Sequence, residues 1–450
     1  MSSFNPNLTY FVERLQGVST NTFRLESQNK IQASANDIVT FDLPSNAILN
    51  LRSFKVWCNA NANHGSATAG ARLPPIADLV ERVEVSVGGI VLAQGTNFVN
   101  VLREAKKSLQ VDNCDSVCGH PEYVRRVSYI DGFGDGAGAP LAATGNEAYA
   151  PASGEPVFCL DEWEGFLGTA DPKLLDTSLV PDIRVRLYLA SNNVLTTSKG
   201  VVIGNTGASA FCGNNQANAV ANAGTGAAAY RLKNIHATIE AIGLADQSYD
   251  KMLSAQMSAQ GFLEIPYKSY QCFNDTHTGS SRFSVSTQSL DRVWLAWRNK
   301  DYNSQIAPIC VNGHKLNGAF VDPTAGAGVT TTDIGLPQYD AGGVLDTNNE
   351  RYKSQYFNFT QPIAGTQLQL QLNGAYMPQF NAYLSELYGM SRNSLPGHRV
   401  SKNMSLDQYL NNYCVQCFRL NMPDSEFSRL ISGLDTRAVN LQGIVKSTTS

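Results

Sequence analysis

Two groups of cysteine and histidine residues lie close enough together to be considered as metal ligands. One group consists of Cys114, Cys118 and His120, and the other of Cys414 and Cys417. A structural zinc site needs four ligands, usually supplied as two close pairs. Because Cys414 and Cys417 are three positions apart in an expected strand, their side chains should point to opposite faces. We therefore interpret that pair as buried small apolar residues, and zinc stays an alternative only for the first group.

A glycine-rich run at positions 132–138 raises the question of a phosphate-binding loop. No Lys-Ser or Lys-Thr follows the run, and it does not connect a strand to a helix, although a phosphate cradle needs both features. Asp131 and Asp135 in this run could bind calcium weakly, but the segment has neither a repeat nor a closing carboxylate. We favour a surface loop over an ion site.

Acid–base chemistry has one candidate segment, the acidic cluster Asp161-Glu162-Trp163-Glu164. Glycosidase carboxylates are paired in space, so closeness in the sequence says little about them, and we favour a turn with solvated charges and an inward-pointing Trp163. The six histidines are scattered, and none lies in a Gly-x-Ser-x-Gly or His-Glu-x-x-His context. We predict that the chain is not an enzyme and that it has no catalytic, cofactor-binding or metal-binding residues and no cofactor.

The segments around these residues have the sequence pattern of strands. Alternation of apolar and polar residues is found in segments 23–26, 38–43, 49–58, 80–87, 181–189, 290–297, 368–372 and 413–420. Gly88-Gly89 and Asn373-Gly374 offer the positive φ angles that tight hairpin turns need. Segments 96–109 and 380–390 have helical spacing instead. The pattern predicts an all-β fold with short helices.

The two halves of the chain repeat one plan. Residues 85–89 match residues 370–374 as strand and turn, and residues 98–102 match residues 383–387 as helix, in one ungapped stretch. Any two β-rich stretches can be aligned loosely, but the recurrence of strand, turn, strand and helix favours a duplication. Segments 131–156, 195–228 and 321–348 interrupt the plan, and we interpret them as long projecting loops because loops of this length are uncommon and usually functional or disordered.

Composition points to a surface that is covered by other chains. Only 16% of the residues are charged, against about 25% in typical soluble domains. The formal net charge is −4, and the basic pairs Lys106-Lys107 and Arg125-Arg126 are isolated, so a solvated face explains them better than phosphate binding. We therefore expect no sequence-specific nucleic acid as a partner.

The start of the chain and its cysteines indicate where it is made. No basic region followed by an apolar run is found before Tyr10, so we expect no secretory signal. No window approaches the roughly 18 consecutive apolar residues of a spanning helix. Nine cysteines, an odd number, are typical of reduced thiols. We predict synthesis in the interior of a host cell, without secretion.

Trp294 and Trp297 are three positions apart on an expected strand and should face opposite ways. Trp297 continues the stripe of Val293 and Leu295 and is expected in the core. Trp294 would then be covered by a neighbouring sheet or subunit, or be exposed. It is therefore the residue at which we would look for an interface hot spot.

This arrangement resembles the double jelly-roll major capsid proteins of tailless icosahedral double-stranded DNA viruses. The resemblance extends over residues 20–421 and rests on two β-rich halves of one plan, each with a helix after a hairpin, and on long uncharged loops. The segments Phe262–Ile265, Ser286–Arg298 and Gln367–Met390, with the helix start Asp246-Gln-Ser-Tyr-Asp, are similar in texture to capsid proteins of polinton-like viruses and virophages.

The resemblance implies two tandem eight-stranded jelly-roll sandwiches with short helices and long surface loops. The chain would divide into an N-terminal arm or helix (1–20), a first jelly roll (21–195), a loop-rich linker with the start of the second half (196–245), a second jelly roll (246–421) and a C-terminal tail (422–450). The tail alternates and has no partner within the repeat. We therefore expect it to add a strand to a neighbouring capsomer or to clamp it.

The function that the resemblance implies is that of a major capsid protein in the virion. Three copies would form a pseudo-hexameric capsomer in which sandwich walls bury large apolar faces between subunits, and capsomers would contact one another. Penton and minor capsid proteins are further implied partners, and an inner membrane is left open. A carbohydrate-binding jelly-roll adhesin or fibre protein is the second hypothesis. A hydrolase on a β-sandwich scaffold is the third, because a fold does not fix a function.

Overall fold

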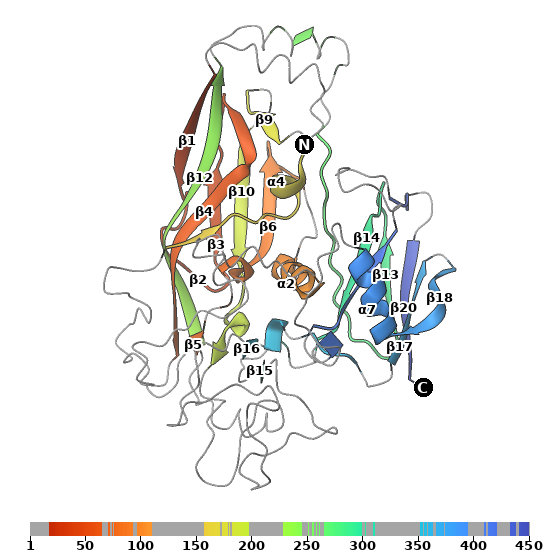
Figure 1. The fold of residues 1–450 in the computed structure, drawn as a ribbon. Helices are drawn as coiled ribbons and strands as arrows, with labels where there is room; N and C mark the ends of the chain where they lie inside the picture. Colours follow the sequence, from red (N-terminus) through yellow and green to blue (C-terminus); the bar gives the residue numbers. More distant parts are fainter. Residues whose placement is uncertain are drawn as a thin grey trace, which may run out of the picture.

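The fold was analysed in a computed structural model. It describes residues 18–64, 71–72, 74, 76–92, 97–109, 157–171, 173–178, 180, 182–197, 228–244, 251, 254–255, 258, 261, 265–298, 302, 309–310, 352–353, 355–357, 359–362, 366–372, 374–394, 409–410, 413–420, 433–437 and 441–449. Strands prevail over short helices in these residues, which confirms the predicted all-β class. Figure 1 shows the strands gathered into two groups that lie side by side.

The first group is a sandwich whose principal strands pair in a nested order. The pairs are β1 (Val18–Glu26) with β12 (Ala228–Leu244), β3 (Ile38–Asp42) with β10 (Ile183–Leu189), β4 (Ile48–His64) with β8 (Val157–Leu160), and β6 (Val80–Val87) with β7 (Ile90–Val91). The chain thus follows the path of one long antiparallel hairpin that is rolled up. Rolling produces the sheets β1-β12-β4-β8 and β3-β10-β6-β7, which is a jelly roll.

Short elements complete the first sandwich. They are β2 (Ala33–Ser34), β5 (Ala71–Arg72), the 3-10 helix η1 (Ile76–Leu79), helix α4 (Phe166–Thr169), β9 (Leu174–Asp176), the 3-10 helix η2 (Asn192–Val194) and β11 (Thr196–Thr197). β2 extends the larger sheet beside β12, and β9 extends it beside β4.

Strand β10 shows how the alternating sequence builds this sandwich. Its odd-numbered residues from Ile183 to Leu189 are buried in the core between the sheets. Arg184 and Arg186 point to the other face, where they form ion pairs of 2.6 Å with Asp42 and 2.7 Å with Glu84. The apolar stripe that predicted the strand therefore also decides which face is inside.

A hairpin followed by a helix occurs in both halves, as the internal repeat predicts. In the first half β6 and β7 are joined by Gly88 and Gly89, with φ of 56° and 86°, and helix α2 (Val99–Leu109) follows. In the second half β17 (Thr366–Leu372) and β18 (Ala375–Tyr383) turn at Gly374, with φ of 87°, and helix α7 (Leu384–Asn393) follows. Positive φ is the reason for glycine at these turns.

The second group of strands is also a sandwich of two sheets. One sheet has the order β13-β20-β17-β18, with β13 (Ser280–Val285) and β20 (Leu441–Thr449) adjacent to each other, and the other consists of β14 (Arg292–Ala296) and β19 (Val415–Arg419). A core with Leu368, Leu370, Phe418 and Leu387 lies between the sheets and helix α7. The small pair β15 (Ile309–Cys310) and β16 (Tyr352–Lys353) and the 3-10 helix η5 (Gln355–Phe357) complete the described elements.

The outer pairs of the second sandwich repeat the nesting of the first, since β13 pairs with β20 and β14 with β19. The inner hairpin differs. Strand β17 joins the sheet of β20, whereas its first-half counterpart β6 joins the sheet of β10. The two halves are therefore related in plan but not identical in pairing among the described residues.

Three expectations about strands were wrong. The segment 228–244, assigned to the linker, is the long strand β12 between β1 and β4, and thus belongs to the first sandwich. The tail was expected to reach a neighbour, but β20 lies between β13 and β17 in the sheet of its own chain. The helix expected at 380–390 begins only at Leu384, because β18 continues to Tyr383.

The position of β20 gives a test on stability. A Cβ atom on Gly443 would overlap the ring of Phe283, its cross-strand partner. We predict that Gly443→Ala lowers the free energy of unfolding by about 1–3 kcal/mol through overpacking, measured by urea denaturation. Gly389→Ala is the control, since its Cβ would meet nothing within 4 Å in α7, and it should stabilise by about 0.5–1 kcal/mol. A neutral Gly443→Ala would mean that the Phe283 ring is not held over Gly443.

Candidate functional site

The structure describes one of the two groups of metal-ligand candidates, Cys414 and Cys417. Both cysteines are buried. Cys414 lies in the core of the second sandwich, and Cys417 lies in the core that includes the first. Opposite faces and an apolar role were expected for this pair, and the structure confirms both. Burial raises the pKa of each thiol to about 12, so both stay protonated and are poor nucleophiles.

The other ion-site candidates cannot be placed. They are Cys114, Cys118, His120, Asp131, Asp135 and the glycine run at 132–138, and all of them lie outside the described residues, as does the basic pair Arg125-Arg126. Among the residues that are described, no three His, Cys, Asp or Glu side chains gather in a way that could hold a metal ion.

The acidic cluster holds elements together instead of forming a solvated turn. Trp163 points inward as predicted, and its Nε1 donates a hydrogen bond of 2.6 Å to the Phe54 carbonyl. Glu164, expected in solvent, forms an ion pair of 2.6 Å with Lys106 of α2, and both side chains are largely buried. The expectation of solvated charges was therefore wrong for Glu164 and Lys106, because helix α2 packs over the loop that carries the cluster.

Helix α2 is further fixed by a buried charge. The Arg103 guanidinium lies 3.7 Å from the Asp78 carboxylate, and the side chains are 4% and 0% exposed. Arg103 also donates to the Ala77 carbonyl, and Asn100 donates to the Asp78 carbonyl at 3.1 Å. This arrangement ties α2 to η1 in the first sandwich. It offers no room for a substrate, so we assign it a structural role.

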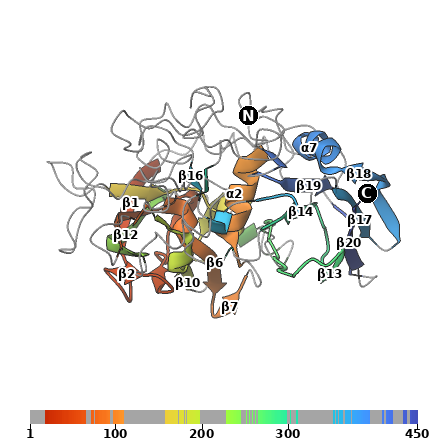
Figure 2. The same ribbon diagram turned by 90° about the horizontal axis from the view of Figure 1, so that it is seen from below.

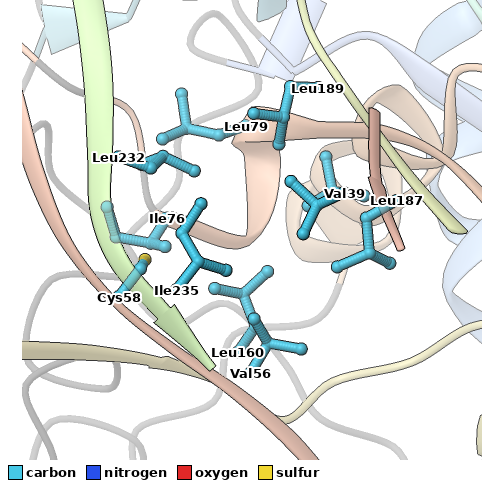
Figure 3. Close-up of a pocket in the computed structure, with 11 residues that line it drawn as sticks. Val39, Val56, Cys58, Ile76, Leu79, Leu160, Leu187, Leu189, Leu232 and Ile235 are labelled. Atoms are coloured by element: carbon cyan, nitrogen blue, oxygen red, sulfur yellow. The ribbon is translucent and has the colours of Figure 1, made fainter. Parts of the chain in front are cut away.

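The interior of the first sandwich is also too closely packed for a ligand. Figure 3 shows the side chains around a cavity between its sheets, among them Val39, Cys58 and Leu187. Eleven residues line this space, and its volume of about 20 Å³ corresponds to a single water molecule. An apolar space of this size stays dry and has no polar group to orient a substrate.

The most unusual feature of the structure is that strand β19 is buried on both faces, with the partly buried strand β14 beside it. On one face Trp294, Val415 and Cys417 pack into the core that includes the first sandwich, and on the other Val293 and Phe418 pack into the second. The prediction that Trp294 and Trp297 face opposite ways is confirmed. Trp294 is partly buried and packs against a core of its own chain.

A polar side chain inside this junction has its hydrogen bonds satisfied. Gln416 is 0% exposed, its Oε1 accepts a bond of 2.6 Å from Trp297, and its Nε2 donates to the Tyr409 hydroxyl at 3.2 Å. The Tyr409 hydroxyl in turn donates to the Val415 carbonyl at 2.7 Å. Because an unpaired buried amide is costly, these bonds fix the orientation of β19 between the two cores.

Arg298, just after β14, joins the two halves by stacking. Its guanidinium carbon lies 3.8 Å from the ring centre of Tyr302 and 5.3 Å from those of Tyr356 and Phe98. Tyr302 and Tyr356 belong to the second half and Phe98 to the first. Burial raises the pKa of the nearby Glu81 carboxyl, and the positive charge of Arg298 opposes that rise. The cation is thus surrounded by aromatic rings from both halves.

The segment 265–270 also binds the second half to the first. The Pro266 carbonyl accepts a bond of 3.0 Å from Asp171, and the Tyr267 hydroxyl donates to the Leu92 carbonyl. Lys268 forms an ion pair of 2.9 Å with Asp291 beside β14. The two sandwiches therefore form one body.

The edge strand β18 and the helix that follows it carry exposed apolar side chains. Tyr376, Phe380 and Tyr383 of β18 are 40%, 56% and 43% exposed, and Met390 of α7 is 43% exposed. Between Met377 and Ala382 the pairing with β17 is irregular, and such bulges re-aim side chains. We name these four residues the β18 patch. The sequence analysis missed it because residues 380–383 were interpreted as helix, although the aromatic residues of 376–383 are a signal for a strand.

The described helices were also checked for membrane spanning, and none of them has the length and apolar character that crossing a bilayer requires.

The junction gives a second test. We predict that Arg298→Met lowers the free energy of unfolding by about 2 kcal/mol, the value of a desolvated cation–π contact, measured by guanidinium titration of tryptophan fluorescence. Arg298→Lys should lose less stability than Arg298→Met but should not reach the stability of the wild type, because an ammonium group does not stack as a plane. Arg24→Met is the matched control in an exposed ion pair with Glu26 and should change stability by less than about 0.5 kcal/mol. Equal losses for Arg298→Met and Arg24→Met would contradict the role of the junction.

Viral capsid proteins are among the solved structures to which the chain is similar. No protein-family model matches the sequence, and no curated protein matches it. Among solved structures, PBCV-1 Vp54, fitted into a reconstruction of the virophage Sputnik, is similar with 13% identity and a TM-score of 0.49, over 96% of this chain and 85% of that one. The Faustovirus major capsid protein has 11% identity and a TM-score of 0.43, over 96% and 87%. The mavirus major capsid protein has 9% identity and a TM-score of 0.33, over 95% and 87%.

Proposed function

We propose that this chain is the major capsid subunit of an icosahedral virus and acts as a rigid tile of the shell. The observation that carries the proposal is strand β19, whose buried residues contribute both to the core that includes the jelly roll and to the core of a second sandwich of related plan. Domains of one chain usually move relative to each other unless their interface is large and apolar. A shell needs a constant angle between neighbouring contacts, and a rigid pair of sandwiches provides it.

The outer surface supports assembly as well. The β18 patch exposes three aromatic residues and a methionine, which are residue types that interfaces favour. The low charge of the chain, 16% of residues, agrees with surfaces that other copies cover, because charged residues are depleted in interface cores.

The assembly that fits two sandwiches per chain is a homotrimer. Three copies would arrange six sandwiches around a closed ring, which approximates a hexagonal tile. Hexagonal tiles alone form a flat layer, so penton and minor capsid proteins are the partners that we propose for the five-fold vertices and the seams. In this proposal the protein is located in the virion. Synthesis in the interior of the host cell and contact with an inner membrane stay predictions.

The experiment is a native mass measurement of the purified full chain, combined with negative-stain electron microscopy. We predict trimers with a six-lobed outline, and closed shells at higher protein concentration or with added sulfate, which strengthens apolar burial. A monomer that persists at about 100 µM, a concentration well above the Kd of ordinary stable interfaces, would contradict the proposal. Glycan binding by a discrete oligomer that forms no shell would favour the adhesin hypothesis instead.

A further inference from the structure

One histidine of the second half contacts both sheets of the second sandwich. The Nδ1 atom of His277 lies 2.8 Å from the Ser281 hydroxyl of β13, and its Nε2 atom lies 2.5 Å from the Ser447 hydroxyl of β20. The imidazole also packs against the ring of Trp297, just after β14, with 4.8 Å between the ring centres and an interplanar angle of 79°. We name these four residues the His277 site. It connects the sheet of β13 and β20 with the strand β14 of the other sheet.

The strand that this site holds in place has few buried side chains. Strand β20 lies between β13 and β17 and pairs with both, and in Figures 1 and 2 this sheet lies on the side of the molecule away from β1. Of the side chains of β20 that the structure describes, those at Gly443 and Val445 are buried, and glycine has no side chain to place in the core. Val445 in the core and Ser447 at the His277 site are therefore side-chain anchors that supplement the two backbone ladders.

The His277 site also reaches the junction between the sandwiches. The Trp297 ring that contacts His277 donates a hydrogen bond of 2.6 Å from its Nε1 to Gln416 of β19. Gln416 in turn donates to the Tyr409 hydroxyl at 3.2 Å. His277 therefore packs on a side chain that itself supports the buried strand β19.

The surroundings of His277 provide no counterion in contact with a protonated ring. Both ring nitrogens face hydroxyl groups, and neither contacts a carboxylate of the described residues. Asp275 in the same loop is exposed, and its charge attracts the ring without bonding to it. On β13 and β20 the neighbouring cations Arg282 and Lys446 alternate to the sheet face opposite the site, where Arg282 is exposed and Lys446 lies over an aromatic ring. On the side of β14, Arg298 is held by the aromatic rings of the junction.

The titration of His277 follows from these surroundings. Burial lowers the pKa of its imidazole below the ordinary value of 6.5, and the charge of Asp275 opposes part of that shift. In weakly acidic solution the folded chain therefore binds fewer protons at this residue than the unfolded chain does. By linkage, the stability that the neutral ring contributes is fully present above pH 6.5 and is lost as the pH falls through the lower pKa of the folded chain.

We propose that His277 makes the attachment of β20 acid-sensitive, so that protonation of the ring loosens β20 from β13. Because an unpaired buried charge is costly, the protonated ring is more stable in water than between Trp297 and the two hydroxyls. When the ring leaves, β20 loses the contact at Ser447. Histidine is the side chain whose charge ordinarily changes between about pH 5 and 8. This property belongs to the single chain and goes beyond the proposed capsid role.

Hydrogen exchange of the full-length isolated subunit tests the proposal. Protection factors of the β20 amides are measured by mass spectrometry at about pH 7.5 and about pH 5, which bracket the ordinary titration of histidine, and they remove the pH dependence of the intrinsic exchange rate. We predict that acid lowers the protection of β20 by a larger factor than that of β10 in the first sandwich. His277→Gln keeps a donor and an acceptor but takes up no proton, and it should abolish this difference.

The matched control is His236→Gln. His236 lies on β12 of the first sandwich, where its Nδ1 is 2.9 Å from the Asn234 carbonyl, and its replacement should leave the acid response of β20 in place. Ser447→Ala is the second variant, should His277→Gln fail to fold. It removes the contact of β20 with the ring, and it should lower the protection of β20 at about pH 7.5 and reduce the acid response.

An NMR titration of ¹³C-labelled histidine rings gives the protonation directly, since the signal that His277→Gln removes is that of His277. It should titrate below pH 6.5. Titration at or above this value, or an equal acid response of β20 in the wild type and in His277→Gln, would overturn the proposal. A subunit that never forms shells would contradict the capsid function instead, because the acid response is measured without assembly.

Discussion

The structure depends on one strand, β19, that has no face toward solvent. Strand β19 lies between two apolar cores, so that every residue from Cys414 to Phe418 is buried. A strand in this position cannot follow the usual alternation of apolar and polar residues, because both faces must be compatible with a core. The sequence Cys-Val-Gln-Cys-Phe meets that requirement, and its single polar residue, Gln416, bonds to Trp297 and Tyr409.

The remaining contacts between the halves follow from this strand. With β19 against helix α2 of the first half, Arg298 after β14 lies near the rings of Phe98, Tyr302 and Tyr356. The second sandwich is then completed by the last strand of the chain, β20, which fills the place between β13 and β17. The result is one body that contains two sandwiches of related plan.

Local pattern predicted much of this fold. The alternation in β10, the glycine turns and the two helices after the hairpins follow from side-chain period and φ preference, which are properties of neighbouring residues. The alternation of β20 was visible too, but its partners Ser280–Val285 and Thr366–Leu372 are remote in the chain, so the pattern could not show which sheet it joins. Burial on both faces of β19 and the solvent exposure of Phe380 on β18 likewise depend on tertiary contacts that a single sequence does not encode locally.

The central claim is that the β14-β19 sheet locks the two sandwiches into one cooperative body. Native-state hydrogen exchange of the amides of Val415, Cys417 and Phe418 tests it most directly, because protection reports the free energy of the opening that exposes each amide. If the claim is right, these amides exchange only through global unfolding, as slowly as the core amides of β10 in the first sandwich and of β17 in the second. Exchange through a separate opening that leaves β10 protected would show that the second sandwich detaches on its own, and would contradict the account.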